Sequence, residues 1–153
     1  MENKNSTSII FYRMSVLGIV CSIILIGVIS YVSLISSERL DSVNFIPFDD
    51  KGAHMLAYAI LGVFLYFSFV RISFTLHHQN KDILTSNWII LPSVFTLVSG
   101  VIIGTILEFI QKTVEREFDI YDIVADGLGL LVGCAIGYYV LQAVIKIAIA
   151  RNR

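Results

Sequence analysis

The chain has 153 residues, of which 56% are hydrophobic and only 15% are charged, and its mean hydropathy is +0.80. A typical soluble domain has about 45–50% apolar and about 25% charged residues, so a soluble fold of this length would leave too much apolar surface in water. The net charge of -1 and the absence of a basic tract argue against a nucleic-acid-binding protein. The composition therefore predicts a membrane protein with a single domain over residues 1–153.

Four apolar segments are long enough to cross a bilayer, which takes about 20 residues of helix. They cover residues 14–35, 53–73, 88–110 and 123–149. The first follows Lys4 and Arg13, but it is longer than the apolar region of a signal peptide, about 7–15 residues, so we expect it to be retained. The sequence thus predicts an all-α membrane protein that forms a four-transmembrane-helix bundle.

The distribution of charge predicts how the bundle is oriented. With four spans, both termini lie on the same side as the loop between the second and third spans. That side carries seven Lys and Arg residues and the other side carries four. Because cytoplasmic loops are enriched in basic residues, we expect cytoplasmic termini and a multi-pass protein of the cell inner (cytoplasmic) membrane. Ten of the twelve acidic residues fall on the outer side, and since acidic residues contribute little to orientation, this excess suggests another role.

The second span opens with polar residues at helical spacing. Asp50, His54 and Tyr58 are four residues apart, so they share one helix face, and Lys51 lies close to the same stripe. An aspartate just before a helix often serves as its N-cap, which is the alternative interpretation of Asp49 or Asp50. His54 falls about one turn inside the span, where the alternative is a packed histidine without a function.

The third span ends with Glu108 and Gln111, which are three residues apart and share a face. A carboxylate inside a transmembrane helix costs a few kcal/mol, so we expect Glu108 to face the bundle and to have a partner. A purely structural ion pair with Lys51 or Arg116 is the alternative to a functional role.

The fourth span opens with a third polar stripe. Asp119, Asp122 and Asp126 follow i, i+3, i+7 spacing on one face, and Arg116 precedes them. Asp119 or Asp122 can act as the N-cap of this helix. Asp126 lies a full turn beyond Asp122, too deep for capping, and its alternative role is that of a buried hydrogen-bond partner.

Glycines follow the third stripe at intervals of four residues. Gly129, Gly133 and Gly137 form a repeated G-x-x-x-G pattern, which allows close helix packing, and Gly100 and Gly104 offer a matching groove on the third span. We assign these glycines to packing only, and oligomerisation through such faces is compatible with them. The three stripes are predicted to meet at one depth near the outer leaflet, where they form a polar site.

In three motifs the chain resembles the VanZ-like family of bacterial integral membrane proteins: Asp50-Lys51-x-x-His54-x-x-x-Tyr58, Glu108-x-x-Gln111 and Arg116-x-x-Asp119-x-x-Asp122-x-x-x-Asp126-Gly-x-Gly129. The resemblance covers residues 49–137. The founding member of that family is linked to low-level resistance to the glycopeptide teicoplanin, so the resemblance implies a bacterial membrane protein of the cell envelope. Where Asp126 stands, the family usually has asparagine, which implies that Asp126→Asn is tolerated.

The predicted site suits a phosphate-bearing lipid. Lys51, Lys112 and Arg116 would hold a phosphate, helped by the N-termini of the second and fourth spans. His54 would act as an acid–base group with Asp50 or Glu108. We therefore expect the protein to bind or modify a phospholipid head group or a lipid-linked cell-wall intermediate. The predicted catalytic residues are His54, Glu108 and Asp122, and the predicted ligand-binding residues are Asp50, Lys51, Tyr58, Gln111, Arg116, Asp119 and Asp126.

Two other functions are compatible with the same residues. One is a non-catalytic accessory protein whose polar cluster holds the helices in register. The other is a small transporter of lipid or of a proton-coupled substrate, in which Glu108, Asp126 and His54 relay protons. Carboxylate oxygens also suit a divalent cation, but no ligand spacing requires one, so neither a metal nor another cofactor is predicted.

Overall fold

The computed structural model describes residues 3–33, 50–79, 88–111 and 120–150, and every structural statement below refers to these residues. They form four long helices, α1 (Asn3–Ser33), α3 (Asp50–Gln79), α4 (Leu91–Gln111) and α5 (Ile120–Ala150), with a short 3-10 helix, η1 (Trp88–Ile90), leading into α4. The four long helices are each long and apolar enough to cross a membrane. The prediction of an all-α protein with four transmembrane helices is thus confirmed.

The membrane-compatible parts of the helices match the predicted segments to within a few residues, and several of them extend beyond the predicted ends. They cover Ser8–Ser33, Lys51–His77, Leu91–Gln111 and Ile120–Ala148. The second span continues four residues past the predicted end at 73, and the first begins six residues before the predicted start at 14. Helical backbone satisfies its own hydrogen bonds, so a helix extends through polar residues at the membrane boundary where a hydropathy pattern ends.

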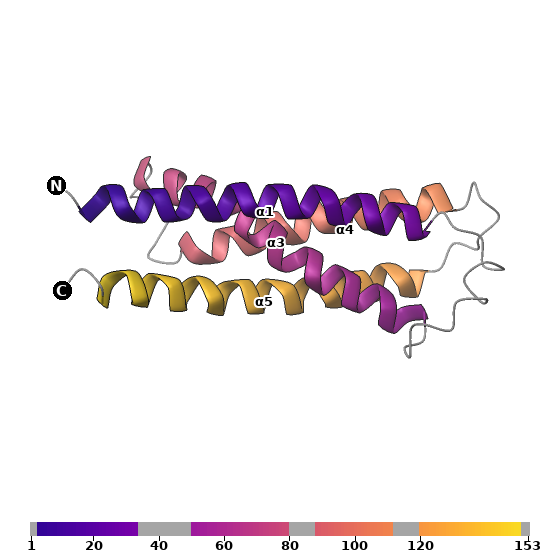
Figure 1. The fold of residues 1–153 in the computed structure, drawn as a ribbon. Helices are drawn as coiled ribbons and strands as arrows, with labels where there is room; N and C mark the ends of the chain where they lie inside the picture. The colour runs from indigo at the N-terminus through magenta and orange to yellow at the C-terminus, as the bar shows by residue number, and fades with distance from the viewer. Residues whose placement is uncertain (1–2, 34–49, 80–87, 112–119, 151–153) are drawn as a thin grey trace.

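The helices alternate in direction (Figure 1). As a result α1 begins and α5 ends at one end of the bundle, which we call the termini end. At the opposite end, which we call the distal end, α3 and α5 begin and α4 finishes. The three predicted polar stripes belong to these three helix ends, so the topology brings them to the same end of the molecule.

The central helix is α3, which packs against α1, α4 and α5. Its contact with α5 is a backbone contact at glycine. A side chain at Gly133 would collide with the Ala59 carbonyl, and one at Gly62 would lie 3.1 Å from the Leu130 carbonyl. Two helices can approach this closely only where neither carries a side chain.

Gly129 and Gly133 of α5 therefore pack against α3, and not against the predicted groove on α4. The expected groove of Gly100 and Gly104 on α4 does not receive them, because α3 offers its own glycine, Gly62, directly opposite Gly133. Gly100 instead accommodates the side chain of Leu130, and Gly104 faces polar atoms of α3 and α5.

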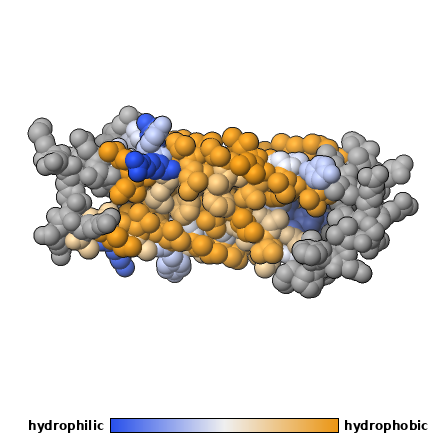
Figure 2. Space-filling view, viewed as in Figure 1, coloured by the Kyte–Doolittle hydropathy of each residue, from blue (hydrophilic) through white to orange (hydrophobic). Residues whose placement is uncertain are grey.

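An apolar surface covers the visible face of the bundle between its ends (Figure 2). Ile24 on α1, Val98 on α4 and Leu131 on α5 are each more than half exposed, as are many other large apolar side chains. An exposed apolar surface of this extent indicates contact with lipid. The structure therefore supports a multi-pass membrane protein.

Candidate functional site

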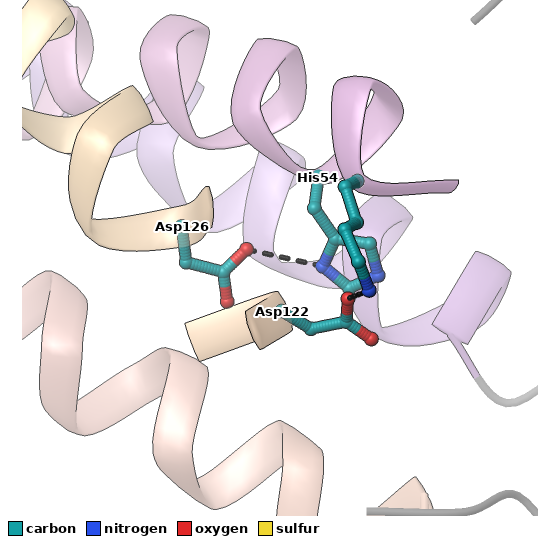
Figure 3. Close-up of polar contacts among 4 residues, drawn as sticks. His54, Asp122 and Asp126 are labelled. Atoms are coloured by element: carbon teal, nitrogen blue, oxygen red, sulfur yellow. Dashed lines mark hydrogen bonds and ion pairs between the residues drawn. The ribbon is translucent and has the colours of Figure 1, made fainter. Parts of the chain in front are cut away.

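The centre of the distal polar cluster is a contact between α3 and α5. The Nδ1 atom of His54 lies 3.0 Å from the Oδ1 atom of Asp126, and the two side chains are only 15% and 6% exposed. Figure 3 shows the two side chains pointing toward each other from their separate helices. Two polar groups that sequence spacing placed on different stripes thus form one buried pair.

Local packing explains why these two side chains meet. Gly129 lies one turn after Asp126, and a side chain there would collide with the backbone carbonyl of Met55, the residue after His54. The missing side chain lets α5 approach the first turns of α3 so closely that a histidine and an aspartate span the gap. Glycine packing therefore positions the polar pair.

Tyr58 lies one turn deeper on α3 and is 2% exposed. Its hydroxyl is within hydrogen-bonding reach of the Asp126 carboxylate. Gly104 of α4 faces both groups, because a Cβ atom at that position would lie 2.9 Å from Asp126 Oδ2 and 3.3 Å from the Tyr58 hydroxyl oxygen. Gly104 thus leaves the space that this polar contact occupies. The sequence identified Gly104 only as a packing residue. Its position four residues before Glu108, on the same face of the helix, was the signal that could have linked it to the polar cluster.

A second contact between α3 and α5 lies nearer the helix ends. Lys51 Nζ is 3.5 Å from Asp122 Oδ1, and the side chains are 47% and 9% exposed. The Lys51 ammonium also lies 5.5 Å from the ring centroid of Tyr121. Asp122 Oδ1 is buried and accepts no hydrogen bond from the described residues, so its contact with Lys51 is electrostatic. Lys51, predicted to hold a phosphate, already faces a carboxylate.

Asp122 lies in the first turn of α5 and not at its N-cap, since the helix begins at Ile120. A carboxylate in the first turn interacts favourably with the positive end of the helix dipole. The capping interpretation therefore does not hold for Asp122, which instead directs its carboxylate toward α3 (Figure 3).

The third helix contributes Glu108 and Gln111, which are 2% and 3% exposed on the buried face of α4. The expectation that Glu108 faces the bundle is confirmed. Glu108 is close enough to Tyr58 to act on it electrostatically, which connects α4 to the cluster of α3 and α5. Gln111 shares this buried face, one turn nearer the helix end.

Several predicted site residues lie outside the described part of the chain. They are Arg116 and Asp119, together with Lys112 and Asp49. Asp50 begins α3, but its side chain is also outside the described part. The described members that come together are His54, Tyr58, Asp126 and Glu108, with Lys51 and Asp122 beside them and Gln111 on the same face of α4.

The geometry of the His54–Asp126 pair suits acid–base chemistry. When Nδ1 carries the proton, it donates a hydrogen bond to the carboxylate. Nε2 then keeps a lone pair and can accept a proton from a ligand. The carboxylate then both orients the imidazole and stabilises its protonated form. The structure pairs His54 with Asp126, a partner that the sequence analysis did not name. The expected partner Asp50 has its side chain outside the described part of the chain. Among the described residues, no three His, Cys, Asp or Glu side chains converge in a geometry suited to a metal ion.

Comparisons of the chain with family models, curated proteins and solved structures found no match. The resemblance to the VanZ-like family therefore stays a prediction.

Proposed function

We propose that the distal cluster binds the head group of a membrane lipid or of a lipid-linked envelope intermediate, and that His54 supplies acid–base chemistry to it. The observation that carries this proposal is the His54–Asp126 pair, 3.0 Å apart and almost buried between two transmembrane helices. Ionisable groups inside a membrane span are costly and typically mark functional sites.

The lengths of the spans support a position of the pair at the depth of lipid head groups. The span of α5 has 29 residues, so it is about 44 Å long at about 1.5 Å per residue, longer than the hydrocarbon core of about 30 Å. Its first turns therefore extend into the polar interface. His54 and Asp126 lie three and six residues inside their spans, about 5 and 9 Å from the ends, at the boundary between head groups and acyl chains.

The proposed chemistry starts from the His54 Nε2 atom. It would accept a proton from a hydroxyl group or a water molecule beside the bound head group, while Asp126 holds the imidazole in place and stabilises its positive charge. Tyr58 lies one turn deeper on α3, and together with the buried Glu108 of α4 it closes the site toward the apolar interior. Arg116 and Lys112 are the proposed partners of a phosphate, because Lys51 faces Asp122.

We also propose cytoplasmic termini, which place the distal cluster at the outer leaflet, on the ground that seven basic residues fall on the side of the termini and four on the other. The three motifs that resemble the VanZ-like family support a location in the bacterial inner membrane and a role in glycopeptide susceptibility. These proposals concern orientation and physiology, and they are independent of the geometry of the site.

The second candidate is a structural lock, meaning a non-catalytic protein whose polar cluster only holds the helices in register, and one observation favours it. The His54–Asp126 pair joins the same two helices that touch at Gly129 and Met55, so it reinforces an existing contact. Proton-coupled transport has less support, because no Asp, Glu, His, Lys or Arg in the described part of the chain lies near the middle of a span.

Native mass spectrometry of the purified protein, with and without substitutions, separates these functions. We expect a phospholipid or lipid-linked phosphate to co-purify with the unchanged protein. His54→Ala, Glu108→Gln and Arg116→Ala should each abolish its retention while the protein still accumulates normally in the membrane. Gln142→Ala is the control, because Gln142 hydrogen-bonds Tyr138 on α5 at the termini end, away from the cluster. Loss of accumulation in all three site variants would instead identify a structural lock.

A further inference from the structure

A second polar arrangement lies at the termini end, where α3 leaves the membrane. The guanidinium of Arg71 lies 5.0 Å from the ring centroid of Tyr12 on α1. Arg71 is exposed on the outer surface of the bundle, and Tyr12 is half exposed. Arg71 precedes the end of its span at His77 by six residues, so its Cα atom lies about 9 Å inside.

A buried serine of α1 hydrogen-bonds the backbone of α3 at Arg71. The Ser15 hydroxyl donates to the Phe67 carbonyl and accepts from the Arg71 backbone N–H, with both distances 3.1 Å. Ser15 therefore bridges a carbonyl and an N–H of α3 that are four residues apart. Tyr12 lies three residues before Ser15, on nearly the same face of α1. The two helices thus hold the ring and the guanidinium at one level before any ligand binds.

Charge at this end is of one sign within the described residues. The acidic residues of the described ranges, Asp50, Glu108, Asp122 and Asp126, all belong to helix ends at the distal end. Arg13, Arg71 and Lys146 are exposed toward the termini end, and none of them forms an ion pair with a described carboxylate. A guanidinium at a lipid-facing surface is stable only where its charged group reaches water or an anion.

We propose that Arg71 and Tyr12 bind the phosphate of an anionic phospholipid in the leaflet at the termini end. Contact with an aromatic face leaves guanidinium N–H groups to donate to phosphate oxygens, and the planar group suits phosphate better than an ammonium does. The Tyr12 hydroxyl is a further donor. This site lies at the opposite end of the bundle from the proposed function and does not depend on it.

The surroundings of the pair indicate a lipid and not a free anion. Ile9 and Val16 lie one turn either side of Tyr12 on α1, and Ile72 follows Arg71 on α3. Their exposed fractions are 52%, 43% and 50%. These apolar side chains offer acyl chains a surface directly beside the charged group, which a free phosphate would not use.

Native mass spectrometry of the full chain in detergent, titrated with phosphatidylglycerol or with phosphatidylcholine, tests this site. The unchanged protein should retain phosphatidylglycerol in preference to phosphatidylcholine. Arg71→Gln should weaken that retention about tenfold, because the charge-assisted hydrogen bonds from the guanidinium to the phosphate are lost. Lys146→Gln, which removes an exposed positive charge from α5 at the same end, should keep the original affinity.

Two tyrosine variants keep the test decisive if Arg71→Gln does not accumulate. Tyr12→Phe keeps the ring and should retain most of the lipid, whereas Tyr12→Leu removes the ring without changing any charge and should lose it. Unchanged retention in Arg71→Gln, or an equal loss in Arg71→Gln and Lys146→Gln, would overturn the site. Displacement of the lipid by excess inorganic phosphate would show that a free anion is the ligand, and would also overturn the proposal.

Discussion

At the distal end of the bundle, the carboxylates of Asp122 and Asp126 are buried and each contacts a basic or imidazole group of α3. At the termini end, the side chains of Arg13, Arg71 and Lys146 are exposed and form no ion pair with a described carboxylate. The distal contacts connect α3 to α5 and require a defined helix packing. The contact of Arg71 with Tyr12 lies on the outer surface and leaves room for a lipid. The buried distal charges therefore form a site inside the protein. The exposed Arg71 would form a site only together with a lipid from the membrane.

Removing the buried carboxylate should have the largest effect. Asp126→Ala leaves His54 Nδ1 and the Tyr58 hydroxyl without this acceptor, and breaking a buried pair in this way costs about 3–5 kcal/mol. We expect strongly reduced accumulation in the membrane and a lower Tm in detergent. Asp126→Asn is the matched control and should keep the accumulation and the Tm, because an amide oxygen still accepts a hydrogen bond from Nδ1. Equal losses in the two variants would show that the negative charge is needed.

Filling the space at Gly104 should have the next largest effect. In Gly104→Ala the new Cβ atom lies 2.9 Å from Asp126 Oδ2, so the carboxylate or the tyrosine must move, at a cost of about 1–3 kcal/mol. Lipid retention at the distal site should fall with it. Gly27→Ala is the control, since no atom lies within 4 Å of its Cβ position. Similar unfolding temperatures for the two variants would contradict a role for Gly104 in positioning the pair.

At the termini end, Ser15→Ala should have a smaller effect on stability. It removes the hydroxyl that bridges Phe67 and Arg71, each such hydrogen bond being worth about 1 kcal/mol. The loss should weaken the contact of α1 with α3 and the retention of phosphatidylglycerol. Ser30→Ala is the control, because the Ser30 hydroxyl bonds only the Ile26 carbonyl of its own helix among the described contacts. Thermal unfolding and native mass spectrometry measure the two consequences separately.

Neutralising the outer ion pair should change stability least. Lys51 is 47% exposed and 3.5 Å from Asp122, and because water reaches the ammonium the pair contributes about 0–1 kcal/mol, although Asp122 is only 9% exposed. Lys51→Gln should therefore leave the Tm almost unchanged at high ionic strength. A large decrease in Tm would show that the polar contacts of the distal cluster depend on one another. The distal contacts would then contribute more to stability, relative to those at the termini end, than the exposure of Lys51 suggests.

Much of the fold follows from the sequence because the bilayer imposes a simple rule. A segment of sufficient apolar length becomes a helix, and consecutive helices that cross a membrane alternate in direction. Alternation alone brings the starts of α3 and α5 and the finish of α4 to one end, so the grouping of His54, Glu108 and Asp126 could be predicted. The contacts between these residues could not be predicted, because spacing along one helix does not show how that helix is rotated about its axis relative to its neighbours.

The glycines show what only the tertiary structure decided. Gly129 and Gly133 were recognisable as packing residues from their spacing, but any of the other helices could have received them. The presence of Gly62 opposite Gly133 made α3 the partner, and that choice placed Asp126 against His54 and left Gly104 facing the polar contact. The sequence by itself determined the number of spans and the end at which the polar residues gather. Close packing between helices, which depends on complementary shapes from distant segments, decided which of those residues meet.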